Sequence, residues 1–102
     1  MIQDMTDIQT LTKEKIKLDE PGMYDVIMLN DNITTMEFVV KVLKQIFGKT
    51  PEQALDITKK IHEHGQGIVG SYTHEVAEQK GIEATLAARQ ENFPLQVKVK
   101  KQ

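Results

Sequence analysis

The chain has 102 residues, of which 39% are hydrophobic, and this size suits one domain with one modest core. Its 13 basic and 15 acidic residues give a formal net charge of −2 and are interspersed along the chain. Such a balance argues against a surface for a phosphate backbone, so we expect no nucleic-acid partner. The absence of cysteine excludes disulfides, thiolate zinc sites and cysteine nucleophiles.

The first residues lack the basic stretch and apolar run of a secretory signal. No apolar segment approaches the roughly 20 residues that span a bilayer. We therefore expect a cytoplasmic protein with no membrane partner.

Residues 1–20 mix polar and charged side chains with single apolar ones, and the turn-forming pair Pro21-Gly22 follows them. This composition predicts a flexible N-terminal arm over residues 1–20. The rest of the chain, residues 21–102, is expected to form a single folded domain.

Residues 23–29 form a short apolar run with β-branched members, which is typical of a strand buried on both faces. The run ends at Asn30, Asp31 and Asn32, whose short polar side chains bond nearby backbone and favour a turn. We expect a central strand followed by a turn.

A first helix is predicted to start at Thr34 or Thr35, because residues 34–37 (TTME) fit the capping-box pattern. Gly48 supplies the left-handed residue that commonly ends a helix. The apolar side chains that recur at helical spacing and should be buried are Met36, Val39, Val40, Leu43, Ile46 and Phe47.

A second helix has the same kind of start signal, with Thr50 as the cap, Pro51 at the first helical position and Gln53 at the third. It should end at Gly65 and Gly67. One buried side is expected, consisting of Ala54, Ile57 and Ile61.

Residues 68–73 suggest a strand in which Gly70 marks a bulge or a close backbone approach. A third helix is expected to start at Thr73, although Gly81 within it costs about 1 kcal/mol relative to Ala. Its expected buried residues are Val76, Ala77, Ala84, Ala87 and Ala88.

Residues 95–100 alternate strictly between apolar and polar side chains, as in a strand with one wet face. The predicted order of elements is therefore βααβαβ. The short connections favour an α+β fold in which a three-stranded, mainly antiparallel sheet packs on three helices.

Candidate chemistry gathers at Asn30, Asp31 and Asn32. A turn is the ordinary interpretation, but their oxygens could also accept hydrogen bonds from a small cation. A protein α-amino group is such a cation, since its pKa of about 7.7 to 8.0 keeps it largely protonated at neutral pH. His62, at the end of the second helix, could add a neutral acceptor that weakens in acid.

Metal binding and catalysis are weaker interpretations of the same residues. His62, His64 and His74 lack the spacing of a zinc site. An Asp31/His62 acid-base pair would have no activated nucleophile and no phosphate loop beside it. We expect no enzyme activity, no metal and no cofactor.

Several segments, taken in chain order, resemble one known family. Residues 29–40 (LNDNITTMEFVV) look like the NDDxTPMEFV segment of the ClpS family, the bacterial N-end-rule adaptors. Residues 61–67 (IHEHGQG) are similar to its VHxxGxG turn, and residues 70–80 (GSYTHEVAEQK) to its GVYTxEVAETK segment. With Pro94-Leu95, the resemblance covers residues 21–101 nearly without gaps.

The resemblance implies a non-enzymatic, monomeric adaptor. It would bind proteins that begin with Phe, Tyr, Trp or Leu and deliver them to a Clp AAA+ unfoldase through a ClpA- or ClpC-type N-terminal domain. By position, the α-amino group would be held by Asn30, Asp31, Asn32 and His62. The side-chain pocket would be lined by Ile33, Thr34, Met36, Val39, Thr58, Ile61 and Leu95. Unfoldase docking would fall on Glu75 and Lys80, and delivery would also involve the arm of residues 1–20.

Three residues depart from the family pattern. Asn32 replaces a second Asp, which reduces the negative charge offered to an amine. Thr58 replaces a Met that many members place against the ligand, and Thr35 replaces a Pro in the first helical turn. The alternative to the adaptor function is a plain docking domain like the C-terminal domain of the ribosomal stalk protein, whose fold is similar.

Overall fold

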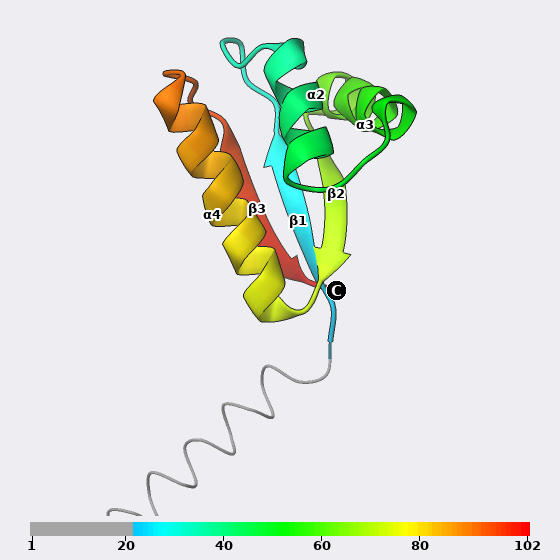
Figure 1. The fold of residues 1–102 in the computed structure, drawn as a ribbon. Coiled ribbons are helices and arrows are strands. Elements are labelled where there is room, and N and C mark those ends of the chain that lie inside the picture. Colours follow the sequence, from blue (N-terminus) through cyan, green and yellow to red (C-terminus); the bar gives the residue numbers. More distant parts are fainter. Residues whose placement is uncertain (1–21) are drawn as a thin grey trace, which may run out of the picture.

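The computed structural model describes residues 22–102, so the arm predicted for residues 1–20 lies outside the described residues. The described elements follow the predicted order (Figure 1). They are β1 (Tyr24–Leu29), α2 (Met36–Gln45), α3 (Pro51–His64), β2 (Gln66–Tyr72), α4 (His74–Gln90) and β3 (Gln96–Lys101).

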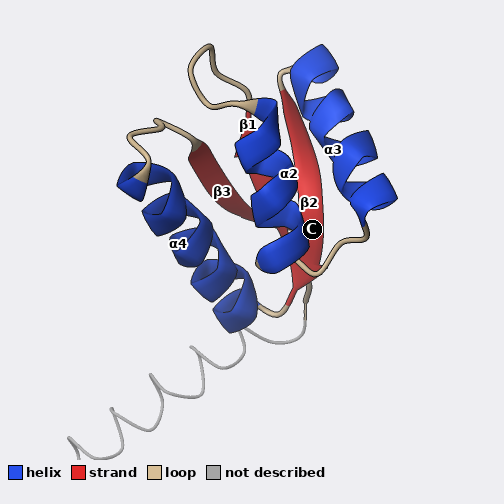
Figure 2. Ribbon diagram, turned by 45° about the horizontal axis from the view of Figure 1, so that its top comes forward, coloured by secondary structure: helices blue, strands red, loops and turns tan. Residues whose placement is uncertain are grey.

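The strands form one sheet in the order β2-β1-β3, and β1 pairs antiparallel with both neighbours. Figure 2 shows the described helices on one side of this sheet, with α4 along one edge and α2 and α3 toward the other. The predicted α+β fold and the central position of the first strand are both confirmed.

A register shift in the β1·β2 ladder leaves Val69 without a strand partner, because Val26 faces Gly70 while Ile27 faces Ile68. This is the bulge that Gly70 suggested. A Cβ at Gly70 would lie 2.5 Å from the hydroxyl oxygen of Tyr72, so a side chain there would displace the Tyr72 ring.

The core lies between the sheet and the helices, and it includes Val26 and Met28 of β1 and Val69 of β2. From α2 it takes Phe38, Val39, Val42 and Leu43. The expected burial of Met36 is wrong, since this side chain is 49% exposed. The buried face of α2 consists of positions 38, 39, 42 and 43, and position 36 falls at its margin.

The α3 start is the predicted capping box. Thr50 Oγ1 accepts from the Gln53 N–H at 3.1 Å, and Gln53 Oε1 accepts from the Thr50 N–H at 3.0 Å. The helix ends at Gly65, as predicted, and this residue takes the left-handed φ of +85°. Its buried residues are Ala54, Thr58 and Ile61.

Helix α4 runs unbroken through Gly81, where a Cβ would lie 3.7 Å from Val97 and Val99 of β3. The small residues along this side let the helix lie close to the sheet. Thr73 occupies the cap position without a side-chain cap bond. The expected burial of Val76 is wrong: it is 42% exposed because the buried line passes through Ala77 instead.

The end of β3 is tied to the start of β1. The Gln102 N–H donates to the Met23 carbonyl at 3.0 Å, and the Gln102 side-chain amide donates to Asp25 at 2.8 Å. Residue 102 therefore lies at the opposite end of β1 from Asn30 (Figure 1). In the described part of the chain, no helix is long and apolar enough to cross a membrane.

Candidate functional site

The turn after β1 is organised by the Asp31 carboxylate. Its Oδ1 accepts from the Ile33 N–H at 2.8 Å and the Thr34 N–H at 2.6 Å, and Oδ2 accepts from Thr34 Oγ1 at 2.7 Å. Partial burial raises the pKa of Asp31, but the bonds from Thr34 and Ile33 outweigh it and hold the pKa below its ordinary value. The carboxylate is therefore charged and fixed in orientation at neutral pH.

These bonds also change the predicted start of α2. Thr34 gives its hydroxyl to Asp31, so the capping box with Glu37 does not form. Thr35 is the cap instead, and its Oγ1 accepts from the Phe38 N–H at 3.2 Å. The alternative start at Thr35 is the one that the structure adopts.

One backbone bond joins this turn to the end of α3. The Asn30 N–H donates to the Gly65 carbonyl at 2.8 Å. His62 lies in the last turn of α3, three residues before Gly65. Strand β1 and helix α3 thus bring the predicted amine-binding residues to one end of the domain. Asp31 is partly buried there, whereas Asn30, Asn32 and His62 are exposed.

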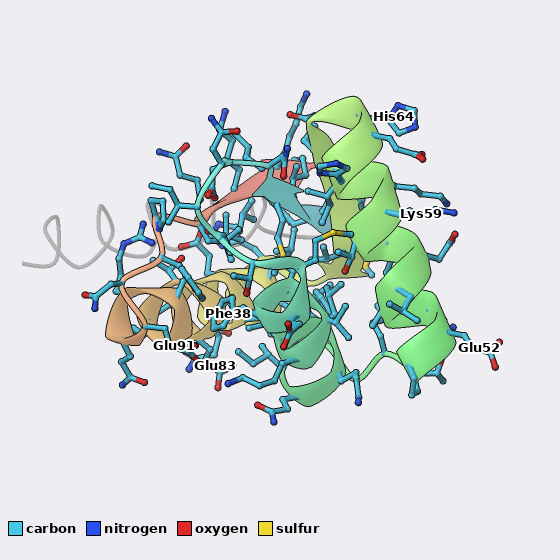
Figure 3. All side chains as sticks on the ribbon, turned by 90° about the horizontal axis from the view of Figure 1, so that it is seen from above. Phe38, Glu52, Lys59, His64, Glu83 and Glu91 are labelled. Carbon is cyan, nitrogen blue, oxygen red and sulfur yellow. The ribbon has the colours of Figure 1, made fainter. Side chains whose placement is uncertain are left out.

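Figure 3 views the molecule from this end. His64 points away from the domain beyond the end of α3, and Phe38 projects from α2 toward α4. Phe38 meets Phe93 edge-on at 5.1 Å between ring centroids. Among the described residues, no group of three or more potential ligands could hold a metal ion.

The residues predicted to line the side-chain pocket differ in burial. Val39, Thr58, Ile61 and Leu95 are buried, with at most 6% of any of them exposed. Thr34 is partly buried, while Ile33 is 63% and Met36 49% exposed. The set therefore divides into core residues that could form a floor and surface residues that could form a rim.

Two contacts concern the buried members of this set. The Thr58 hydroxyl donates to the Ala54 carbonyl at 2.7 Å, so its one proton is used within α3. Gly67 packs against Ile61, where a Cβ would lie 2.9 Å from Ile61 Cγ1. The position of Ile61 therefore depends on the absence of a side chain at Gly67 in β2.

Two hollows border the candidate site. One, of about 290 Å³, is lined by Leu29, Asn30, Asp31, Pro94 and Gln96. The other, of about 440 Å³, was not predicted from the sequence and lies between α2 and α3. A signal for it existed in Leu55, an apolar residue on the polar side of α3 that is 59% exposed.

The predicted docking residues lie on α4, and both line a hollow of about 340 Å³ on its surface. Glu75 is exposed in the first turn. Lys80 is partly buried: its Nζ donates to the Ile46 carbonyl at 2.8 Å and lies 5.4 Å from the centre of the Tyr72 ring. Lys80 thus has a structural role that its sequence position did not reveal.

The comparisons with known proteins identify the family of this chain. The family model of the ATP-dependent Clp protease adaptor protein ClpS matches residues 19–98. The chain belongs to the ClpS family. It is therefore an adaptor of the Clp protease system, and it interacts with a component of that protease.

Relatives named ATP-dependent Clp protease adapter protein ClpS are similar over most of their length. The protein from Campylobacter jejuni subsp. doylei is 46% identical over 95 residues, which are 93% of this chain and 99% of the relative. The protein from Maricaulis maris is 43% identical over 101 residues, which are 99% and 91% of the two chains.

A solved ClpS structure has the same fold. Agrobacterium tumefaciens ClpS2, bound to L-phenylalaninamide, superposes with a TM-score of 0.78 at 31% identity. The match covers 81% of this chain and 100% of ClpS2.

Proposed function

We propose that this ClpS protein binds the N-terminal residue of substrates that begin with Phe, Tyr, Trp or Leu, and delivers them to a Clp AAA+ unfoldase. The supporting observation is the oriented Asp31 carboxylate, which lies in the turn that the Asn30–Gly65 backbone bond joins to the end of α3. The ligand of ClpS2 has matching parts, because L-phenylalaninamide carries a free α-amino group beside an aromatic side chain.

The amine half of the site works through acceptors. A carboxylate offers about four acceptor positions, and the turn occupies three of those on Asp31. One lone-pair direction and the negative charge remain for an ammonium group. In this proposal Asn30 and His62 add further acceptors, while Asn32 contributes an amide oxygen without charge.

The side-chain half supplies the selectivity. Burial of one Phe or Leu side chain contributes about 1.5 to 3 kcal/mol, whereas micromolar binding needs about 8 kcal/mol. Neither half is sufficient alone. A blocked amine or a small first residue should therefore each abolish most of the affinity.

The test is fluorescence anisotropy with labelled peptides that differ only at the first residue. Phe and Leu peptides should bind at least about tenfold more tightly than the Ala peptide and than the N-acetylated Phe peptide. Equal binding of all four peptides would exclude the proposal and favour the plain docking domain.

Site variants make the assignment specific. Asp31→Ala and His62→Ala should each weaken binding of the Phe peptide, while the far-UV circular dichroism spectrum stays unchanged. His64→Ala is the matched control, because His64 lies in the same helical turn but points to solvent. Normal binding by both site variants would refute the residue assignment even if the adaptor function held.

We also propose that Glu75 and Lys80 dock on the N-terminal domain of a ClpA- or ClpC-type unfoldase, with the adaptor acting as a cytoplasmic monomer. Glu75 is the cleaner residue for a test, since it is exposed. Glu75→Lys should weaken the complex with that domain in a binding assay and leave peptide binding intact.

A further inference from the structure

The largest hollow described above is a groove between α2 and α3, which we call the α2–α3 groove. Its apolar residues are Met36, Val40 and Leu55, and its polar residues are Glu37, Lys41, Lys44 and Gln45. Leu55 is 59% and Met36 49% exposed, so the groove presents apolar side chains to solvent. Packing of the core does not account for these two exposed apolar side chains.

The groove begins at the candidate site. Met36 is both the first residue of α2 and one of the residues predicted to line the side-chain pocket. Positions 36, 40 and 44 lie one above another on the same side of a helix. The groove therefore follows α2 away from the turn at Asn30 and Asp31.

Its direction is set by the two helices. Gly65, at the end of α3, is bonded to Asn30, whereas Leu55 lies near the start of that helix. From Met36 to Lys44 the helical rise is about 12 Å. An extended chain covers this distance with about four residues.

The charges along the groove change with distance from the candidate site. Glu37 stands at the near end, and Lys41 and Lys44 stand farther along. Lys41 also meets Glu91 at 3.1 Å, which neutralises part of its charge. Lys44 takes part in no ion pair within residues 22–102, so the far end favours a carboxylate.

We propose that the α2–α3 groove binds the substrate residues that follow the first one, with an apolar side chain near Met36 and Leu55 and a carboxylate near Lys44. The carboxylate would belong to about the fifth substrate residue, given the length of α2. This inference rests on the proposed function. It adds a second, weaker recognition element to the site for the N-terminal residue.

The test compares a short with a long ligand on the full-length protein. L-phenylalaninamide reaches only the first-residue site, whereas an eight-residue peptide Phe-Leu-Ser-Gly-Glu-Gly-Ser-Lys can also enter the groove. Titration should show about fivefold weaker binding of the long peptide to Lys44→Glu, with phenylalaninamide unchanged. Leu55→Ser should have a similar effect.

Matched controls lie outside the groove. Lys59→Glu makes the same charge change at an exposed position of α3, and Leu86→Ser removes an apolar side chain that is 59% exposed on α4. Neither should alter the ratio of the two affinities. If a peptide with Lys at position five restored tight binding to Lys44→Glu, the contact between these two positions would be identified directly.

The outcomes separate the two proposals. If Phe peptides keep their preference over Ala peptides but Lys44→Glu and Leu55→Ser affect neither ligand, the groove proposal fails and the adaptor function stands. If the variants weaken binding of both ligands equally, they act on the first-residue site and the groove proposal also fails. Loss of the preference for Phe over Ala in the parent protein overturns the proposed function itself.

Discussion

Asn30 and Gly65 are 35 positions apart, and their backbones are joined by an N–H···O=C bond of 2.8 Å. Through this bond the end of the central strand is held against the end of α3. The Asp31 turn and His62 are brought to the same end of the domain as a result. The candidate site therefore depends on the docking of α3 as much as on its own side chains.

We expect Asp31→Asn to lower stability at neutral pH by about 1 kcal/mol, since a neutral amide accepts the N–H and O–H bonds of the turn less strongly. Because the folded-state pKa of Asp31 lies below its usual 3.8, its contribution is present above that value and is lost as pH falls through the folded pKa. The free energies of the parent and the variant should therefore converge in acid.

Urea unfolding followed by circular dichroism between pH 6 and pH 2 measures this difference. Asp56→Asn is the control, as its only described ion pair is an exposed one with Lys60 at 3.5 Å. A difference between parent and Asp31→Asn that stays constant over this pH range would show that the carboxylate charge does not hold the turn.

We expect Gly67→Ala to destabilise the domain by about 1 to 3 kcal/mol, because the added methyl group would press on Ile61 Cγ1. The same displacement should weaken binding of the Phe peptide. In an Ile61→Ala background the penalty of Gly67→Ala should largely disappear, which a double-mutant cycle of thermal unfolding can measure. Simple additivity of the two changes would contradict the contact.

At Thr58 we expect substitution by Met to cost about 1 to 3 kcal/mol, since the site is 3% exposed and the new side chain is larger. The extra volume should also reduce binding of a Trp peptide more than that of a Leu peptide. Anisotropy titrations of both peptides measure the ratio. Thr58→Val, which keeps the volume, should stay within about 1 kcal/mol of the parent and leave the ratio unchanged.

We expect Lys80→Met to lower the free energy of unfolding by about 1 to 3 kcal/mol, because it removes a charged donor to the Ile46 carbonyl. Lys59→Met, at an exposed position of α3, should be nearly neutral. Thermal unfolding of both variants provides the comparison. Unchanged stability of Lys80→Met would show that the bond to the Ile46 carbonyl does not stabilise the domain.

The features that could be predicted from the sequence are mostly local. The α3 capping box and the end of α3 at Gly65 involve residues close in the chain, so short patterns identify them. At α2 the sequence allowed either of two threonines as the cap. The hydroxyl of Thr34 bonds to Asp31 in the folded turn, and this bond, which the sequence pattern does not reveal, leaves Thr35 as the cap.

The exposed sides of the helices could not be predicted as well. Helical spacing shows that a helix has an apolar stripe. The rotation of the helix about its axis on the sheet decides which residues beside that stripe are buried. Met36 and Val76 were placed in the core on spacing alone, and both are more than two-fifths exposed. The carbonyl partner of Lys80 lies 34 positions away, beyond the range of any local pattern.

The candidate site could be named only through the resemblance. Asn30, Asp31 and Asn32 have the composition of an ordinary turn, and Asp31 does form one. The fold brings His62 to the same end of the domain, which no spacing in the sequence indicated. The roles of these residues in ligand binding stay predictions until the peptide titrations are made.

The bond between Gln102 and Met23 has a practical consequence for how this protein can be handled in a binding experiment. It holds residue 102 at the end of the central strand that lies farthest from Asn30, about 20 Å away for six strand residues. A sensor surface or a fluorophore attached at that residue would leave the Asp31 turn and the α2–α3 groove facing the solution. Such an immobilised molecule could bind a substrate N-terminus without interference from its own anchor.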